Sequence, residues 1–123
     1  MSKTKAEKPL FLFLFRNPVD SPDPSPEEME KIFGKWMEWM KSMNAKGQFV
    51  GANRLNDAGK TMRGPRGATV TDGPFVETKE MVGGYVLAAG GNLAQAVEIA
   101  RGCPGLDYAI AVEVRPVEQM PPI

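Results

Sequence analysis

The residues with the most chemical potential gather in one polar stretch of the chain. Residues 72–80 read DGPFVETKE and carry the carboxylates of Asp72, Glu77 and Glu80 and the ammonium group of Lys79. A carboxylate beside a cavity can act as a general acid or base if burial raises its pKa, or it can orient a guanidinium group. A hairpin connection needs only about two to five residues. The surplus of polar groups therefore predicts a site here.

Each of these residues also has a structural interpretation. Asp72 can cap the turn by accepting hydrogen bonds from the amides of residues 73–75, which is common at Asp-Gly-Pro. Glu77 and Glu80 are either an acid–base pair tuned by Lys79 or solvated charges at a strand end. The sequence leaves both interpretations open.

Charged residues elsewhere extend the set of candidates. One short segment carries three basic residues, Lys60, Arg63 and Arg66, among glycines and a proline. This pattern is typical of either a solvated turn or an anion-binding loop. Glu113 and Arg115 are expected to form a salt bridge or to hold a carboxylate ligand. The tentative candidates are Asp72 and Glu77 for catalysis and, for ligand binding, Arg63, Arg66, Lys79, Tyr85, Glu113, Arg115 and Trp39.

The composition excludes several classes of protein. Among 123 residues, 15 basic and 15 acidic side chains cancel, whereas a nucleic-acid-binding domain is expected to carry a basic excess or face. The chain has no histidine and a single cysteine, Cys103, so it offers neither an internal disulfide nor a Cys/His zinc site. We expect no metal or other cofactor, no direct contact with nucleic acid, and a structural role for Cys103.

The element that must support these residues begins at residues 10–15, LFLFLF, where leucines face one side of a strand and phenylalanines the other. This run is far shorter than the ~20 residues of a membrane span and lacks the features of a signal peptide. We therefore expect a cytoplasmic protein with no membrane partner. A strand that is apolar on both sides is covered on both faces. The chain can supply one cover, which predicts a second subunit as the other.

Helix and strand patterns follow in a regular order. A capping box at Ser25 and Glu28 and a proline between them predict a helix that ends before Gly47. Its apolar stripe comprises Met29, Ile32, Phe33, Trp36, Met37, Met40 and Met43, and a stripe at this spacing predicts core packing rather than a cofactor site. Trp39 lies at the edge of this stripe, where it can line a pocket or a subunit contact.

Strands are predicted at residues 48–55, from Tyr85 to residue 89, and at residues 108–114. Asn92 caps a second helix with an inner face of Leu93, Ala96, Val97 and Ala100. The order strand, helix, strand, strand, helix, strand predicts an α+β, ferredoxin-like split βαβ domain over residues 9–117. Residues 60–72 add a β-hairpin, and residues 1–8 and 118–123 are expected to be tails.

Several of these motifs occur together in a known family. The chain resembles the DGPF branch of the YCII-related (YciI-like) family in Asp72-Gly73-Pro74-Phe75, Glu77-Thr78-Lys79-Glu80 and Gly83-Gly84-Tyr85. The resemblance implies a homodimeric α/β barrel in which two sheets face each other, and a link to extracytoplasmic-function sigma factors. Some catalytic relatives are thought to pair a histidine with an aspartate, and this chain has no histidine.

Two functional hypotheses remain open on this basis, beside a third possibility that the protein only assembles with others of its kind. The first is a homodimeric ligand-binding or regulatory module whose pocket holds a small anionic molecule. The second is a small enzyme, an isomerase or a dehydrochlorinase-like lyase, in which Asp72 or Glu77 is the acid or base.

Overall fold

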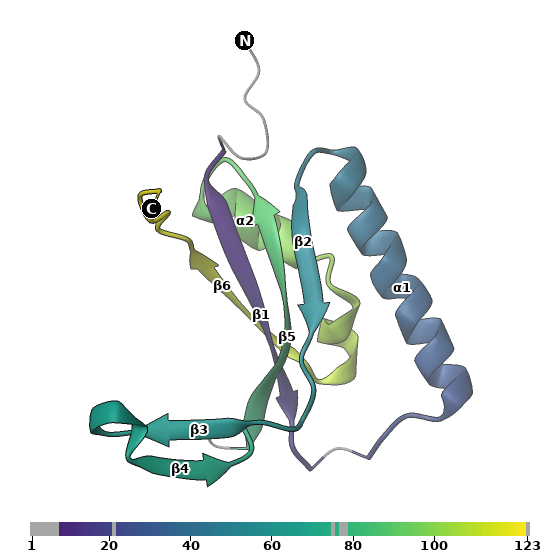
Figure 1. Ribbon diagram of the computed structural model, residues 1–123. Coiled ribbons are helices and arrows are strands. Elements are labelled where there is room, and N and C mark those ends of the chain that lie inside the picture. The colour runs from purple at the N-terminus through teal and green to yellow at the C-terminus, as the bar shows by residue number, and fades with distance from the viewer. Residues whose placement is uncertain (1–7, 21, 75, 77–78, 123) are drawn as a thin grey trace.

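The computed structural model describes residues 8–20, 22–74, 76 and 79–122. Four strands form an antiparallel sheet in the order β2-β5-β1-β6, and β3 and β4 form a separate hairpin (Figure 1). Without the hairpin this is the ferredoxin-like arrangement, so the α+β prediction is confirmed. The elements are β1 (Leu10–Pro18), α1 (Pro26–Ala45), β2 (Phe49–Arg54), β3 (Lys60–Arg63), β4 (Thr69–Asp72), β5 (Glu80–Ala89), α2 (Leu93–Ala100) and β6 (Ala111–Pro116).

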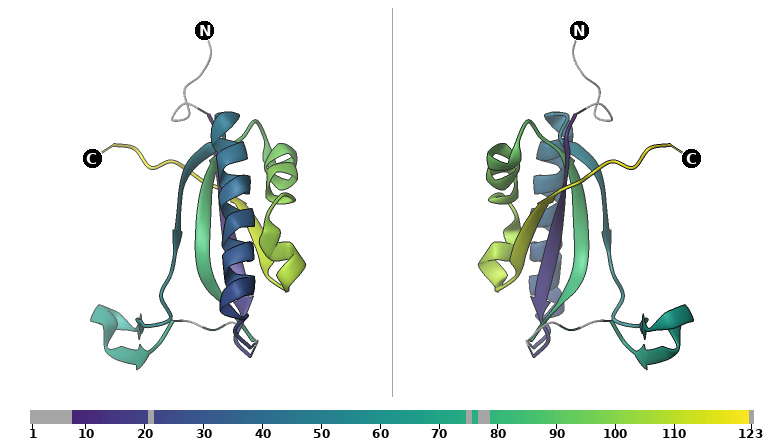
Figure 2. Two further views of the ribbon diagram at one scale, coloured as in Figure 1. Left: turned by 90° about the vertical axis from the view of Figure 1, so that its right-hand side faces the viewer. Right: turned by 90° about the vertical axis from the view of Figure 1, so that its left-hand side faces the viewer.

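Both helices begin at the predicted caps and lie on the same side of the sheet (Figure 2). The Ser25 hydroxyl accepts a hydrogen bond from the Glu28 amide at 3.2 Å, and the Asn92 side chain accepts one from the Gln95 amide at 2.8 Å. These bonds satisfy amides that the first helical turn leaves without partners. Neither helix in the described part of the chain combines the length and hydropathy that a membrane span requires.

The core lies between the sheet and the helices, on the phenylalanine side of β1. Phe11, Phe13 and Phe15 are buried. The Trp36 ring packs edge-on against Phe15 at 4.8 Å between centroids, and Trp39 stacks on Phe13 at 6.3 Å. The alternation of leucine and phenylalanine therefore orients β1 as predicted.

Strand β5 begins at Glu80, five residues earlier than predicted, because Gly83 and Gly84 continue the strand. Phe15 of β1 pairs with Gly84 and Arg16 pairs with Val82, so Gly83 is the extra residue of a β-bulge in β5. A Cβ on Gly84 would lie 3.0 Å from the carbonyl oxygen of Asn53 on β2. The glycines thus allow close approach of two strands, where we predicted a connection.

Other predicted positions also differ. Tyr108 was predicted in the last strand but belongs to a 3-10 helix, η3 (Pro104–Tyr108). Ala109, directly after this helix, has a left-handed conformation with φ of 64°, and the last strand starts only at Ala111. Leu93 was predicted on the inner face of α2 but is exposed, since it lies in the first turn of the helix.

The apolar stripe of α1 is only partly buried. Trp36, Met40 and Met43 of the stripe pack in or against the core, whereas Met29 is 47% and Phe33 63% exposed. The prediction that the whole stripe is core was therefore wrong for the N-terminal half of the helix. Helical spacing defines a face, but it does not define how much of that face the sheet covers.

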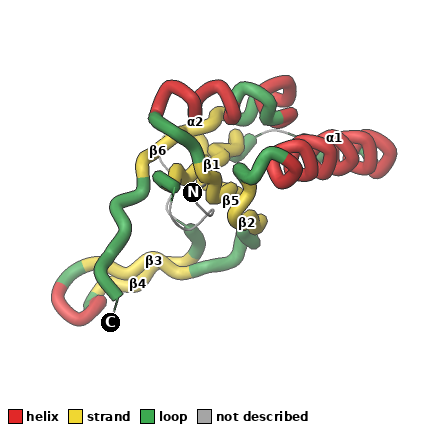
Figure 3. The backbone as a smooth tube through the Cα atoms, turned by 90° about the horizontal axis from the view of Figure 1, so that it is seen from above, coloured by secondary structure: helices red, strands yellow, loops and turns green. Residues whose placement is uncertain are grey.

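We name residues 60–72, which comprise β3, the 3-10 turn η2 (Pro65–Gly67) and β4, the arm. The arm projects from the lower end of the sheet, on the side away from the helices (Figures 2 and 3). At its base the Gly73 amide donates a hydrogen bond to the Gly59 carbonyl at 2.7 Å, and the Thr61 hydroxyl donates one to the Gly73 carbonyl at 3.0 Å.

Candidate functional site

The face of the sheet opposite the helices carries the leucines of β1, and we name it the leucine face. Strand register places residues on it in two rows. One row comprises Asn53, Tyr85, Leu14 and Glu113, and the next comprises Gly51, Leu87, Leu12 and Arg115. Since neighbouring strands lie about 4.8 Å apart, Tyr85 and Glu113 are separated by about 10 Å across β1. The leucines therefore form an apolar floor between polar groups.

A cluster of three charged side chains lies on this face, at β1 and β6. Arg16 donates hydrogen bonds from Nε and Nη2 to Oε1 of Glu113, at 2.9 and 2.7 Å. The second carboxylate oxygen of Glu113 lies 3.8 Å from Nε of Arg115. Two guanidinium groups thus share one carboxylate, which leaves the cluster with a net positive charge of one.

The polar group on the other side of the leucine floor is the Tyr85 hydroxyl. It accepts a hydrogen bond from Nδ2 of Asn53 at 2.9 Å. A phenol that accepts in this way keeps its own proton as a donor. The leucine floor therefore lies between a hydroxyl donor at β5 and guanidinium groups at β1 and β6.

Three of the predicted ligand-binding residues, Tyr85, Glu113 and Arg115, lie on the leucine face. The expected salt bridge between Glu113 and Arg115 is confirmed. Sequence reasoning missed Arg16 and Asn53. The alternation of Leu10, Leu12 and Leu14 extends to position 16, so the side of Arg16 could have been predicted. Asn53 required the register of β2 against β5.

The remaining predicted residues lie elsewhere. Asp72 is on the arm, where it pairs with Lys60 and its side chain is 90% exposed. Arg63 and Arg66 are also on the arm, and the exposed Lys79 directly precedes β5. Glu77 lies outside the described residues. The role predicted for Asp72 in acid–base catalysis depends on burial of its carboxylate. The described surroundings of Asp72 do not bury it and so give this role no support, and it stays a prediction.

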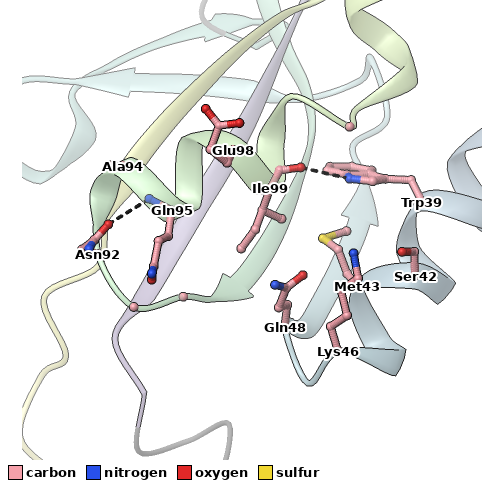
Figure 4. Close-up of a pocket in the computed structure, with 13 residues that line it drawn as sticks. Trp39, Ser42, Met43, Lys46, Gln48, Asn92, Ala94, Gln95, Glu98 and Ile99 are labelled. Atoms are coloured by element: carbon pink, nitrogen blue, oxygen red, sulfur yellow. Dashed lines mark hydrogen bonds between the residues drawn. The ribbon is translucent and has the colours of Figure 1, made fainter.

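Trp39 lies on the helix side of the sheet, away from the leucine face. Its indole nitrogen donates a hydrogen bond to the Ile99 carbonyl at 3.2 Å, and its ring lines a groove of about 770 Å³ between α1 and α2 (Figure 4). Among the described residues of this lining, the charged side chains are those of Lys46 and Glu98, and Glu98 pairs with Arg101. The predicted ligand-binding residues therefore do not form a single site.

Burial also defines the state of the single thiol. Cys103 is buried between α2 and η3, and desolvation raises its pKa to about 11. A thiol with such a pKa is protonated at neutral pH and is a poor nucleophile. The structure thus agrees with the structural role predicted for Cys103.

The fold and the sequence together define the class of the protein. The profile of the YCII-related domain family matches residues 10–121, which is most of the chain. The protein therefore belongs to the YCII-related domain family. A comparison with curated proteins gave no significant match.

Proposed function

We propose that this YCII-related protein is a homodimeric binding module that holds a small anionic molecule on its leucine face. The observation that carries the proposal is the arrangement of Arg16, Glu113 and Arg115 beside an apolar floor, on the sheet face opposite both helices. Guanidinium groups recognise carboxylates and phosphates through paired hydrogen bonds. The Tyr85 hydroxyl, on the other side of the floor, would orient the ligand.

The same face supports the proposed homodimer. A sheet with one face in water normally alternates apolar and polar residues, yet β1 presents Leu10, Leu12 and Leu14, all half-buried, on the side away from the helices. A second copy placed over these leucines would cover them. It would also close a hollow over the charged cluster, where lower dielectric strengthens contacts with an anion. The family resemblance adds a sigma factor as a partner of the dimer.

The ligand site can be tested by thermal shift. Wild-type protein would be screened against small carboxylic acids and phosphate esters, and the active compounds would then be tested on Arg115→Gln. Arg101→Gln is the matched control, because Arg101 is as exposed as Arg115, at 68%, and also pairs with a glutamate.

Ligand binding to the folded state raises the Tm. We expect a rise in the wild type and the control that is lost or reduced in Arg115→Gln. If no compound shifts the Tm, or if both variants respond like the wild type, the site is not on the leucine face.

A further inference from the structure

We infer that the arm of one copy docks on the exposed N-terminal half of α1 in a second copy. Each of the two surfaces has exposed apolar side chains, and the segments that carry them have opposite net charges. The contact involves neither the leucine face nor the groove beside Trp39. It therefore adds a second contact between copies, and it can hold or fail independently of the proposed ligand site.

The arm presents an apolar pair that its own chain leaves open. Met62 and Val70 are cross-strand partners, so their side chains lie next to each other on one face of the hairpin. They are 68% and 54% exposed. Methionine adapts to irregular surfaces, and a hairpin with an exposed apolar pair is a typical contact element.

The start of α1 presents the complementary surface. Met29 and Phe33 lie one helical turn apart on the same face, and both are largely exposed. Glu30 borders this face, because it follows Met29 and lies three residues before Phe33. An exposed phenylalanine beside an exposed methionine indicates a docking surface.

The charges of the two surfaces are opposite. The arm contains Lys60, Arg63 and Arg66 against one acid, Asp72, for a net charge of +2. Residues 20–30 contain five acids and no base, for a net charge of −5: Asp20, Asp23, Glu27, Glu28 and Glu30. The whole chain has a net charge of zero, so positive and negative charge are segregated rather than absent. Such segregation steers one copy toward another.

The geometry favours a contact between copies over one within the chain. The arm and the start of α1 both lie at the lower end of the sheet in Figure 1 but on its opposite sides, as the view from above shows (Figure 3). The sheet thus separates the arm from its own helix. In a two-fold symmetric pair each arm would meet the helix of the other copy, so that the contact occurs twice.

Disulfide trapping between two variants, each with one added cysteine, tests this inference. Met62→Cys protein, carrying an affinity tag, would be mixed with untagged Phe33→Cys protein and oxidised with copper phenanthroline. Each variant has one exposed thiol, because Cys103 is buried, so a mixed disulfide can form only between copies. The matched control is Met62→Cys with Leu93→Cys, since Leu93 is also exposed but lies on α2.

We expect at least about fivefold more mixed disulfide with Phe33→Cys than with Leu93→Cys. Adding Glu30→Lys to the Phe33→Cys protein should lower the yield. Equal yields at the two positions would overturn the inference. If the wild type then still sediments as a dimer, the arm contact is wrong and the proposed leucine-face dimer is unaffected. Preferential trapping in a protein that remains a dimer after Leu12→Glu would instead overturn the leucine-face contact and retain the arm contact.

Discussion

Arg16 reaches across from β1 to β6 and donates two hydrogen bonds to the same carboxylate oxygen of Glu113. This pairing fixes the Arg16 guanidinium on the leucine face while the second oxygen of Glu113 faces Arg115. Glu113 thus positions both cations at one end of the apolar floor. The anion-binding proposal depends on this geometry.

Replacing the carboxylate should therefore destabilise the protein. Glu113→Gln removes the charge that two guanidinium groups share, and Arg16 and Glu113 are only 25% and 35% exposed. With allowance for solvent screening, we expect a loss of about 1 kcal/mol in the free energy of unfolding, measured in urea. Glu98→Gln, which breaks the exposed Glu98–Arg101 pair, should cost less than about 0.5 kcal/mol. Equal effects would contradict a structural role for the Arg16–Glu113 pair.

Gly84 allows β2 to approach β5. A Cβ at this position would lie 3.0 Å from the carbonyl oxygen of Asn53, which is backbone and cannot rotate away. We expect Gly84→Ala to lower the free energy of unfolding by about 1–3 kcal/mol. Gly34→Ala is the control, because a Cβ on this helical residue meets no atom within 4 Å and should stabilise α1 by about 0.5–1 kcal/mol. A neutral Gly84→Ala would show that the sheet tolerates a methyl group here.

Cys103 should make stability depend on pH above pH 9. Its pKa is raised by burial from 9.0 to about 11, so the folded state holds the proton more tightly than the unfolded chain. The stabilisation is complete below pH 9 and is lost as the pH rises toward 11, with a slope of about 1.4 kcal/mol per pH unit. Urea unfolding of the wild type and of Cys103→Ala would isolate this effect. Parallel pH profiles would show that the thiol is not desolvated.

Local patterns predicted much of the fold. The Leu/Phe alternation oriented β1, and the Ser25 and Asn92 caps marked both helix starts, because these signals depend on residues close together in the sequence. The extent of β5 was missed because Gly83 and Gly84 indicate a turn unless the bulge opposite Arg16 is known. The exposure of Phe33 was missed because spacing along a helix does not show where the sheet ends.

The candidate site was predicted only in part for a similar reason. Glu113 and Arg115 alternate visibly along β6, so their common side could be inferred. Their partner Arg16 lies 97 residues before Glu113, and only the strand register joins the two. The register also separates Asp72 from this cluster, since it pairs with Lys60 on the arm.

Sedimentation of the wild-type protein at micromolar concentration tests whether two copies enclose the leucine face. We expect a dimer of twice the 13.4 kDa chain mass, about 27 kDa, and a shift to monomer in Leu12→Glu, which places a charge in the apolar floor. Ala94→Glu, on an exposed position of α2, should remain a dimer. A wild-type protein that sediments as a folded 13.4 kDa monomer would overturn the proposed dimer, because no second copy would then enclose the charged cluster.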